Sequence, residues 1–158
     1  MASTDLTTGP HLVMAVLCEK VLQEQDGVLT IIRIIDQLTQ TAVGPEAPEQ
    51  MPPFIAQNLT MVVTIKADQA RGRYGLRIRP EAPGGFQLPP VEQAITISPG
   101  PGGVNVVMPM ALPISAEGVY WFDVILTAPP TDQPDRLLTR VPLEVQYAPQ
   151  LPAIASSP

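Results

Sequence analysis

The chain has 158 residues, of which 45% are hydrophobic and 15% are charged. This composition is too apolar for a disordered chain, and the length fits one domain. The formal net charge is −6, with nine basic and fifteen acidic residues. General nucleic-acid binding depends on Lys and Arg that neutralise phosphates, so this charge balance excludes it as an expected role.

The start of the chain shows no targeting signal. Met1 is followed by the polar run 2–5, without the basic segment of a signal peptide. The longest apolar stretch, residues 12–18, is far too short to span a bilayer, and the single Cys18 allows no intrachain disulfide. We therefore expect a cytoplasmic protein with no membrane partner.

Clusters of the 20 prolines and 11 glycines separate runs rich in Val, Ile, Leu and Thr. Such clusters are typical of turns, and no run between them keeps a helical period. The expected strands, in chain order, are 11–18, 29–38, 58–68, 72–79, 91–98, 104–114, 119–127 and 137–147. Residues 19–25 fit either a strand or one helical turn, and Asp26-Gly27 is a tight-turn signal. Pro109 and Pro113 predict that the strand over 104–114 is an edge or a bulged strand.

This pattern predicts an all-β fold: an antiparallel two-sheet sandwich of about eight strands, C2-like or immunoglobulin-like in form. The domain is expected over residues 11–147, between flexible tails at 1–10 and 148–158. The segments 11–17 and 29–35 are apolar on both faces, whereas one sandwich covers one face of a strand. Either the proline-rich loop 44–54 or a symmetric homodimer would cover the second face, and we favour the dimer.

Four segments carry a resemblance to a known family. They are Leu17-Cys18-Glu19, the run Asp26-Gly27-Val28-Leu29-Thr30-Ile31-Ile32, the run Glu117-Gly118-Val119-Tyr120-Trp121-Phe122, and Pro142-Leu143-Glu144-Val145. Together they resemble a family of small bacterial β-sandwich proteins that is itself uncharacterised. The resemblance spans roughly residues 11–147 and implies the fold. It brings no catalytic residues to this chain.

No motif predicts a metal, a cofactor or a covalent nucleophile. His11 and Cys18 are seven residues apart, which places them on opposite faces of a strand and argues against zinc. The acids available to calcium in loops are Asp68, the pair Asp132 and Asp135, and the pair Glu24 and Asp26. None of these loops has a dense acidic pattern, so we interpret the acids as turn caps and solvated groups.

Two acids stand within strongly apolar strands and are the candidates for acid–base chemistry. Asp36 follows 31–35, and Asp123 follows Trp121-Phe122. The simpler explanations are that Asp36 pairs with an arginine or ends a strand, and that Asp123 faces outward. Glycan binding would need exposed aromatic residues, for which only Trp121, Phe54 and Phe86 could serve.

Four of the seven arginines have odd numbers within one segment, so a single strand face would carry Arg71, Arg73, Arg77 and Arg79. Lys66 would join them if the preceding strand pairs with this one. We hypothesise that this stripe receives an acidic segment, either of a partner or of the loop 46–49. The alternative is a solvated face paired with acids of a neighbouring strand, such as Glu144.

The sequence therefore favours a non-enzymatic module that binds a protein partner or a second copy of itself. The alternative is a small-ligand or glycan-binding sandwich, or a small enzyme that uses Asp36 or Asp123.

Overall fold

The structure, a computed structural model, describes residues 9–44, 46–128 and 134–150. These residues form nine β-strands and no helix. The strands are β1 (His11–Gln23), β2 (Leu29–Ile34), β3 (Gln37–Val43), β4 (Phe54–Asp68), β5 (Gly72–Glu81), β6 (Val91–Ile97), β7 (Gly100–Ile114), β8 (Gly118–Thr127) and β9 (Arg136–Gln150). The prediction of an all-β fold is confirmed.

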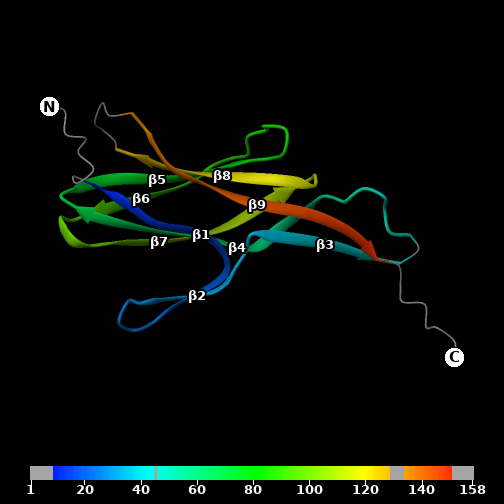
Figure 1. Ribbon diagram of the computed structural model, residues 1–158, viewed down its shortest axis with the longest axis horizontal. Helices are drawn as coiled ribbons and strands as arrows, with labels where there is room; N and C mark the ends of the chain where they lie inside the picture. The colour runs from blue at the N-terminus through cyan, green and yellow to red at the C-terminus, as the bar shows by residue number, and fades with distance from the viewer. Residues whose placement is uncertain (1–8, 45, 129–133, 151–158) are drawn as a thin grey trace.

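The strands form two sheets, shown in Figure 1. The order is β2-β1-β4-β7 in the four-stranded sheet and β3-β9-β8-β5-β6 in the five-stranded sheet. The pairs are antiparallel except for β3 with β9, which is parallel, so the expectation of a wholly antiparallel arrangement is wrong at this edge. β7 is an edge strand, as Pro109 and Pro113 predict.

One expected strand proves to be two. The segment predicted as a single strand over 29–38 is divided between β2 and β3, which lie in different sheets. The chain crosses at Ile35, whose amide donates to the Leu17 carbonyl, and at Asp36, whose carbonyl accepts from the Glu144 amide. Arg33, just before this crossing, has a φ of 57°. Because the two halves pair with different strands, a continuous apolar run does not form one strand.

The ends of the domain also differ from the expected bounds. Pro10 is buried, and its carbonyl accepts a hydrogen bond from Arg136. At the other end, β9 continues to Gln150, three residues beyond the expected limit at 147. The remainders of the two expected tails, 1–8 and 151–158, lie outside the described residues.

The core lies between the sheets and is mainly aliphatic. Its largest fully buried side chains include Tyr120, Phe122, Leu59, Met61 and Ile65. Tyr120 is satisfied there because its hydroxyl donates to the Ala116 carbonyl at 2.9 Å, an arrangement similar to the tyrosine corner of immunoglobulin-like sandwiches. The C2-like or immunoglobulin-like type itself stays a prediction.

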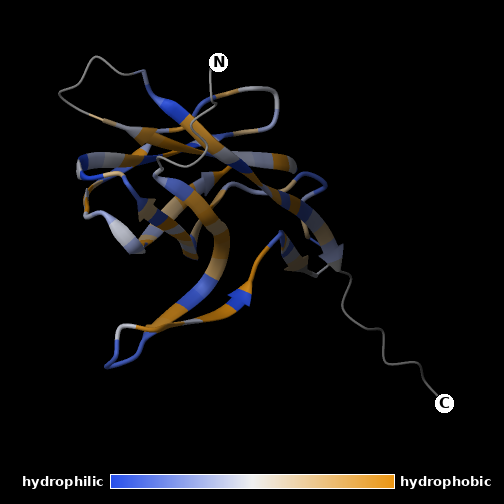
Figure 2. Cartoon of the chain, turned by 60° about the vertical axis from the view of Figure 1, so that its left-hand side comes forward, coloured by the Kyte–Doolittle hydropathy of each residue, from blue (hydrophilic) through white to orange (hydrophobic). Residues whose placement is uncertain are grey.

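The hairpin of β1 and β2 projects from the rest of the molecule in Figures 1 and 2. Its turn is the one that Asp26-Gly27 predicts: Gly27 has a φ of 86°, and its amide donates to the Glu24 carbonyl. Residues 19–23, left open between strand and helix, belong to β1. Figure 2 shows hydrophobic stretches along both strands up to this polar tip. We call residues 19–34 the arm.

Candidate functional site

The outer face of the five-stranded sheet carries an ion-pair cluster centred on Asp123. The strand register places Asp123 of β8 between Arg79 of β5 and Arg140 of β9. Arg79 donates to Asp123 Oδ2 at 2.9 Å, and Arg140 Nε donates to Oδ1 at 2.6 Å. Arg140 also contacts Glu81 at 3.2 Å, and its guanidinium lies 4.9 Å from the centroid of the Trp121 ring. We call these five residues the Asp123 cluster.

The cluster holds Asp123 in its ionised form. Burial by itself raises the pKa of this carboxyl, but the hydrogen bonds from Arg140 and Arg79 outweigh burial, so the pKa lies below its ordinary value. Asp123 in turn raises the pKa of Arg140. Both carboxylate oxygens accept from an arginine, so at neutral pH Asp123 has no proton to donate. This is the chemistry of a structural ion pair, and it gives no support to a general acid.

The arginine stripe is brought together only in part. Arg77 and Arg79 share the outer face of β5, and each has a partner. Arg77 pairs with Glu92 at 3.6 Å and with Asp135 at 3.2 Å, while Arg79 pairs with Asp123. Within the described residues, the ion pairs of the stripe therefore involve neither Glu144 nor the acidic loop 46–49.

Two members of the stripe are misplaced by sequence reasoning. Arg71 precedes β5, so it belongs to a turn and not to the strand face. Lys66 lies on β4, which pairs with β1 and β7 and not with β5. It therefore sits in the other sheet. Arg71 and Arg73 are exposed and form no ion pair within the described residues, so an acidic ligand at these two positions stays a prediction.

Three of the acids considered for metals make other contacts. Asp68 pairs with His11 at 3.1 Å, and Asp26 accepts from the Val28 amide in the hairpin turn. Asp135 pairs with Arg77, and Asp132 lies outside the described residues. The described part of the chain holds no group of three His, Cys, Asp or Glu side chains placed for a metal.

The alternative of a small-ligand, glycan or catalytic site gains no geometric support. Hollows of about 310 and 320 Å³ lie where Pro10 meets Arg136, and neither is lined by Asp36 or Asp123. Asp36 is an exposed residue at the crossing between the sheets. Of the aromatic candidates, Trp121 lies beneath Arg140, Phe54 packs against the core, and Phe86 is exposed in the loop between β5 and β6.

The outer face of the four-stranded sheet is different in kind, because its side chains are mostly aliphatic. In β4 and β7 the side chains that alternate with the core positions form rows across the sheet with those of β1: Met14-Thr64-Asn105, Val16-Val62-Val107 and Cys18-Thr60-Pro109. Ile32 and Ile34 of β2 continue the face onto the arm, where they lie opposite Lys20 and Cys18 of β1. We call this surface, which is defined by Met14, Val16, Cys18, Leu22, Ile32, Ile34, Val62, Val107, Pro109 and Ala111, the apolar face.

Two side chains in the middle of the apolar face have no exposed surface. Val62 and Cys18 are fully buried although they lie on the outer side of the sheet, outside the core cluster. Burial raises the pKa of the Cys18 thiol, as expected for a site lined by aliphatic groups. At the margin, Ile34 is 65% exposed.

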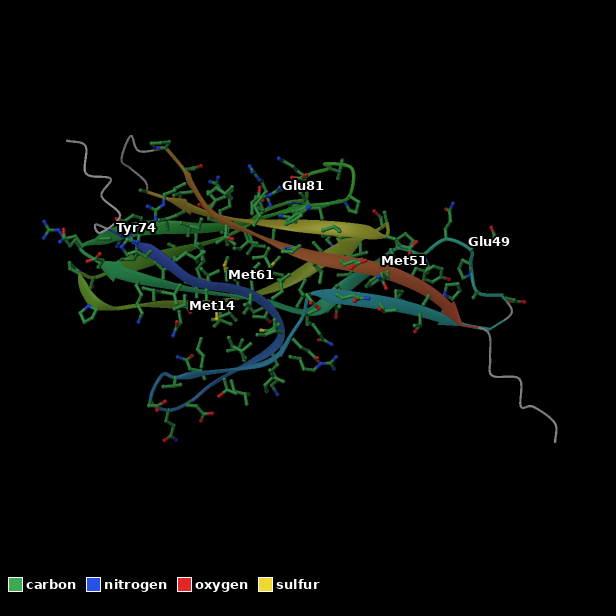
Figure 3. All side chains as sticks on the ribbon, viewed as in Figure 1. Met14, Glu49, Met51, Met61, Tyr74 and Glu81 are labelled. Carbon is green, nitrogen blue, oxygen red and sulfur yellow. The ribbon has the colours of Figure 1, made fainter. Side chains whose placement is uncertain are left out.

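The loop that was expected to cover this second face lies elsewhere. Pro48 accepts a hydrogen bond from the Tyr147 hydroxyl at 2.7 Å, and Met51 is buried in the core. Figure 3 shows Glu49 and Met51 beside the far ends of β3 and β9, away from Met14. The loop alternative is therefore wrong for the part of 44–54 that the structure describes.

Sequence reasoning missed Arg140 and Glu81 as partners of Asp123, and it missed the row along β7. The sequence does contain a signal for the row along β7, because the segment 104–114 has no charged residue on either face. A strand with one wet face normally alternates apolar and polar residues, and this one does not.

The fold and these surfaces define a two-sheet all-β domain with one charged and one apolar outer face. Residues 13–146 match the model of a family described as a family of unknown function (DUF6941), and the chain belongs to this family. The prediction of an uncharacterised family is thus confirmed. A search of curated proteins found no match. Among the described residues, no helix has the length and apolar character that crossing a membrane requires.

Proposed function

We propose that this domain is a non-enzymatic association module of the cytoplasm that binds another protein surface through its apolar face. The observation that supports the proposal is the contrast between the two outer faces. Ionic side chains on the five-stranded sheet are largely paired within the molecule, whereas the outer side of the four-stranded sheet carries aliphatic side chains, of which Ile34 and Leu22 are exposed at the margin. Exposed apolar surfaces of this kind are typical of protein interfaces.

Physical chemistry explains why such a face needs a cover. Each square ångström of apolar surface removed from water contributes about 25 cal/mol, so an uncovered sheet face leaves several kcal/mol of association energy unused. The same face in the unassociated state promotes aggregation. A partner surface that removes it from water gains this energy without any change in the fold.

The test is site-specific photo-crosslinking in the cell that expresses the protein. A photoreactive amino acid at Pro109 lies on the apolar face, and replacing this proline loses no backbone hydrogen bond because proline has no N–H. The matched control position is Thr96, which is exposed on the edge strand β6 of the other sheet. We expect protein adducts from position 109 and none from position 96. Absence of adducts at position 109 would refute an association role for this face.

A further inference from the structure

We propose that the occupant of the apolar face is a second copy of this chain, packed sheet against sheet about a twofold axis. This inference rests on the proposed function and names the partner of the same surface. It involves residues of three paired strands and the arm, none of which belongs to the Asp123 cluster.

The distribution of charge favours a like surface as partner. The central rows of the apolar face carry no ionisable group except the buried Cys18. Lys20 lies on the arm part of this face, between Cys18 and Leu22 and opposite Ile32. Lys66 lies at the other end, beside the His11–Asp68 pair. A polyanionic or polycationic partner would have no counter-charge at the centre of this surface, whereas an equally uncharged face fits it.

The chemistry of the side chains points the same way. The face is formed mainly by Val, Ile, Leu, Met, Ala and Pro. Its rows on β1, β4 and β7 also hold Thr60, Thr64 and Asn105, but neither an aromatic residue nor an arginine. Interfaces between different proteins usually depend on Trp, Tyr and Arg as anchors. Obligate homodimer interfaces are more hydrophobic and resemble a domain core that has been divided in two. Aliphatic rows on a sheet can interdigitate with those of a second sheet about 10 Å away.

The available area is that of a small dimer interface. The three strands lie about 4.8 Å apart and share about eight residues, or about 26 Å, which presents roughly 370 Å². The two strands of the arm, with Ile34 and Leu22 65% and 40% exposed, add roughly 160 Å². Two copies would then bury about 1,000 Å² in total, which is the lower end for a specific interface. A bilayer is a poorer occupant, because the net charge of −6 is repelled by anionic lipid headgroups.

Sedimentation equilibrium of the purified full-length chain tests this inference. The wild-type protein at about 50 µM should have twice the 16.9 kDa mass of one chain. Val107→Glu and Ile34→Glu, made separately, each place a carboxylate within the face and should weaken dimerisation at least about tenfold. Phe86→Glu is the matched control, since Phe86 is 70% exposed but lies in the loop between β5 and β6. It should leave the dimer intact.

Raising the salt concentration provides a second readout. Two copies of charge −6 repel each other, so added salt should strengthen an apolar dimer and would weaken an association of opposite charges. Circular dichroism establishes that each variant is folded. If Val107→Glu does not fold, Ile34→Glu decides, because its side chain is mostly exposed and its replacement disturbs no core packing.

Three results would overturn the inference: a wild-type protein with the mass of one chain, dimerisation of the face variants as tight as that of Phe86→Glu, or weakening by salt. These results differ from failure of the proposed function. A monomeric protein that still forms adducts with another protein from position 109 would contradict the inference of a homodimer but support the proposed association function. A monomeric protein without adducts would contradict both.

Discussion

Replacing Asp123 with Asn removes the negative charge at the centre of the Asp123 cluster and keeps the size of the side chain. The Asp123 side chain is only 7% exposed, and Asn would offer Arg79 and Arg140 one neutral amide oxygen in place of two charged carboxylate oxygens. Removing one partner from a fully buried pair costs about 3–5 kcal/mol. The two arginine side chains are 37% and 41% exposed and regain water, so we expect a smaller loss, about 1–3 kcal/mol.

This contribution depends on pH with a definite sign. The pKa of Asp123 is lowered in the folded protein, because the arginine hydrogen bonds outweigh burial, so folding favours the ionised form. The stability it supplies is complete above the unfolded-state pKa of about 3.9 and disappears as pH falls through the lower folded-state pKa. The difference between wild type and Asp123→Asn should therefore be constant near neutral pH and shrink below about pH 4.

Urea unfolding monitored by circular dichroism measures this difference at pH 7 and at about pH 3. The matched control is Glu92→Gln, which removes a half-exposed partner of Arg77 and should cost less than about 0.5 kcal/mol. The reasoning is refuted if Asp123→Asn costs no more than Glu92→Gln at pH 7. A loss for Asp123→Asn that stays the same at both pH values would contradict the electrostatic explanation.

Three further predictions concern close packing and the buried thiol. A methyl group at Gly103 would meet the Ile65 carbonyl oxygen, whereas one at Gly102 meets open space. Thermal unfolding should therefore show that Gly103→Ala lowers the free energy of unfolding by at least about 2 kcal/mol and that Gly102→Ala changes it little. A methyl at Gly75 would meet the Thr127 hydroxyl, so Gly75→Ala should lose about 1–3 kcal/mol, and adding Thr127→Ala should restore part of it in a double-mutant cycle. Cys18 is fully buried with a raised pKa, so a thiol reagent at pH 8 should react at least about a hundredfold faster in urea than with the native protein. Equal stabilities of Gly103→Ala and Gly102→Ala would contradict the first prediction, and no recovery of stability on adding Thr127→Ala would contradict the second. Equal reaction rates of the thiol with and without urea would contradict the third.

The fold class was predictable because alternation and turn chemistry act locally. The clean alternation in the segment that became β4 and the Asp26-Gly27 turn both report on neighbouring residues, and both were interpreted correctly. The crossing at Ile35 was not predictable from the apolar run, since its two sides pair with Leu17 and Glu144, far apart in the chain. Local pattern does not encode which distant strand a segment will join.

The same limit explains the partial success with the candidate site. The two-residue spacing of Arg77 and Arg79 placed them on one face, but their partners come from three other places in the chain: Glu92, Asp123 and Asp135. Lys66 was assigned to the stripe on the assumption that successive strands pair. That assumption fails here because β4 and β5 belong to different sheets.

Solvent accessibility of individual methyl groups tests most directly whether the apolar face is covered by a second copy. With methyl-labelled protein and a soluble paramagnetic agent, the Ile34 and Val107 methyls should be shielded at about 200 µM and become accessible on dilution. The Leu137 methyls, on a side chain that is 53% exposed in the other sheet, should be accessible at every concentration. If the Ile34 methyls are as accessible as those of Leu137 throughout the dilution series, no second copy covers this face.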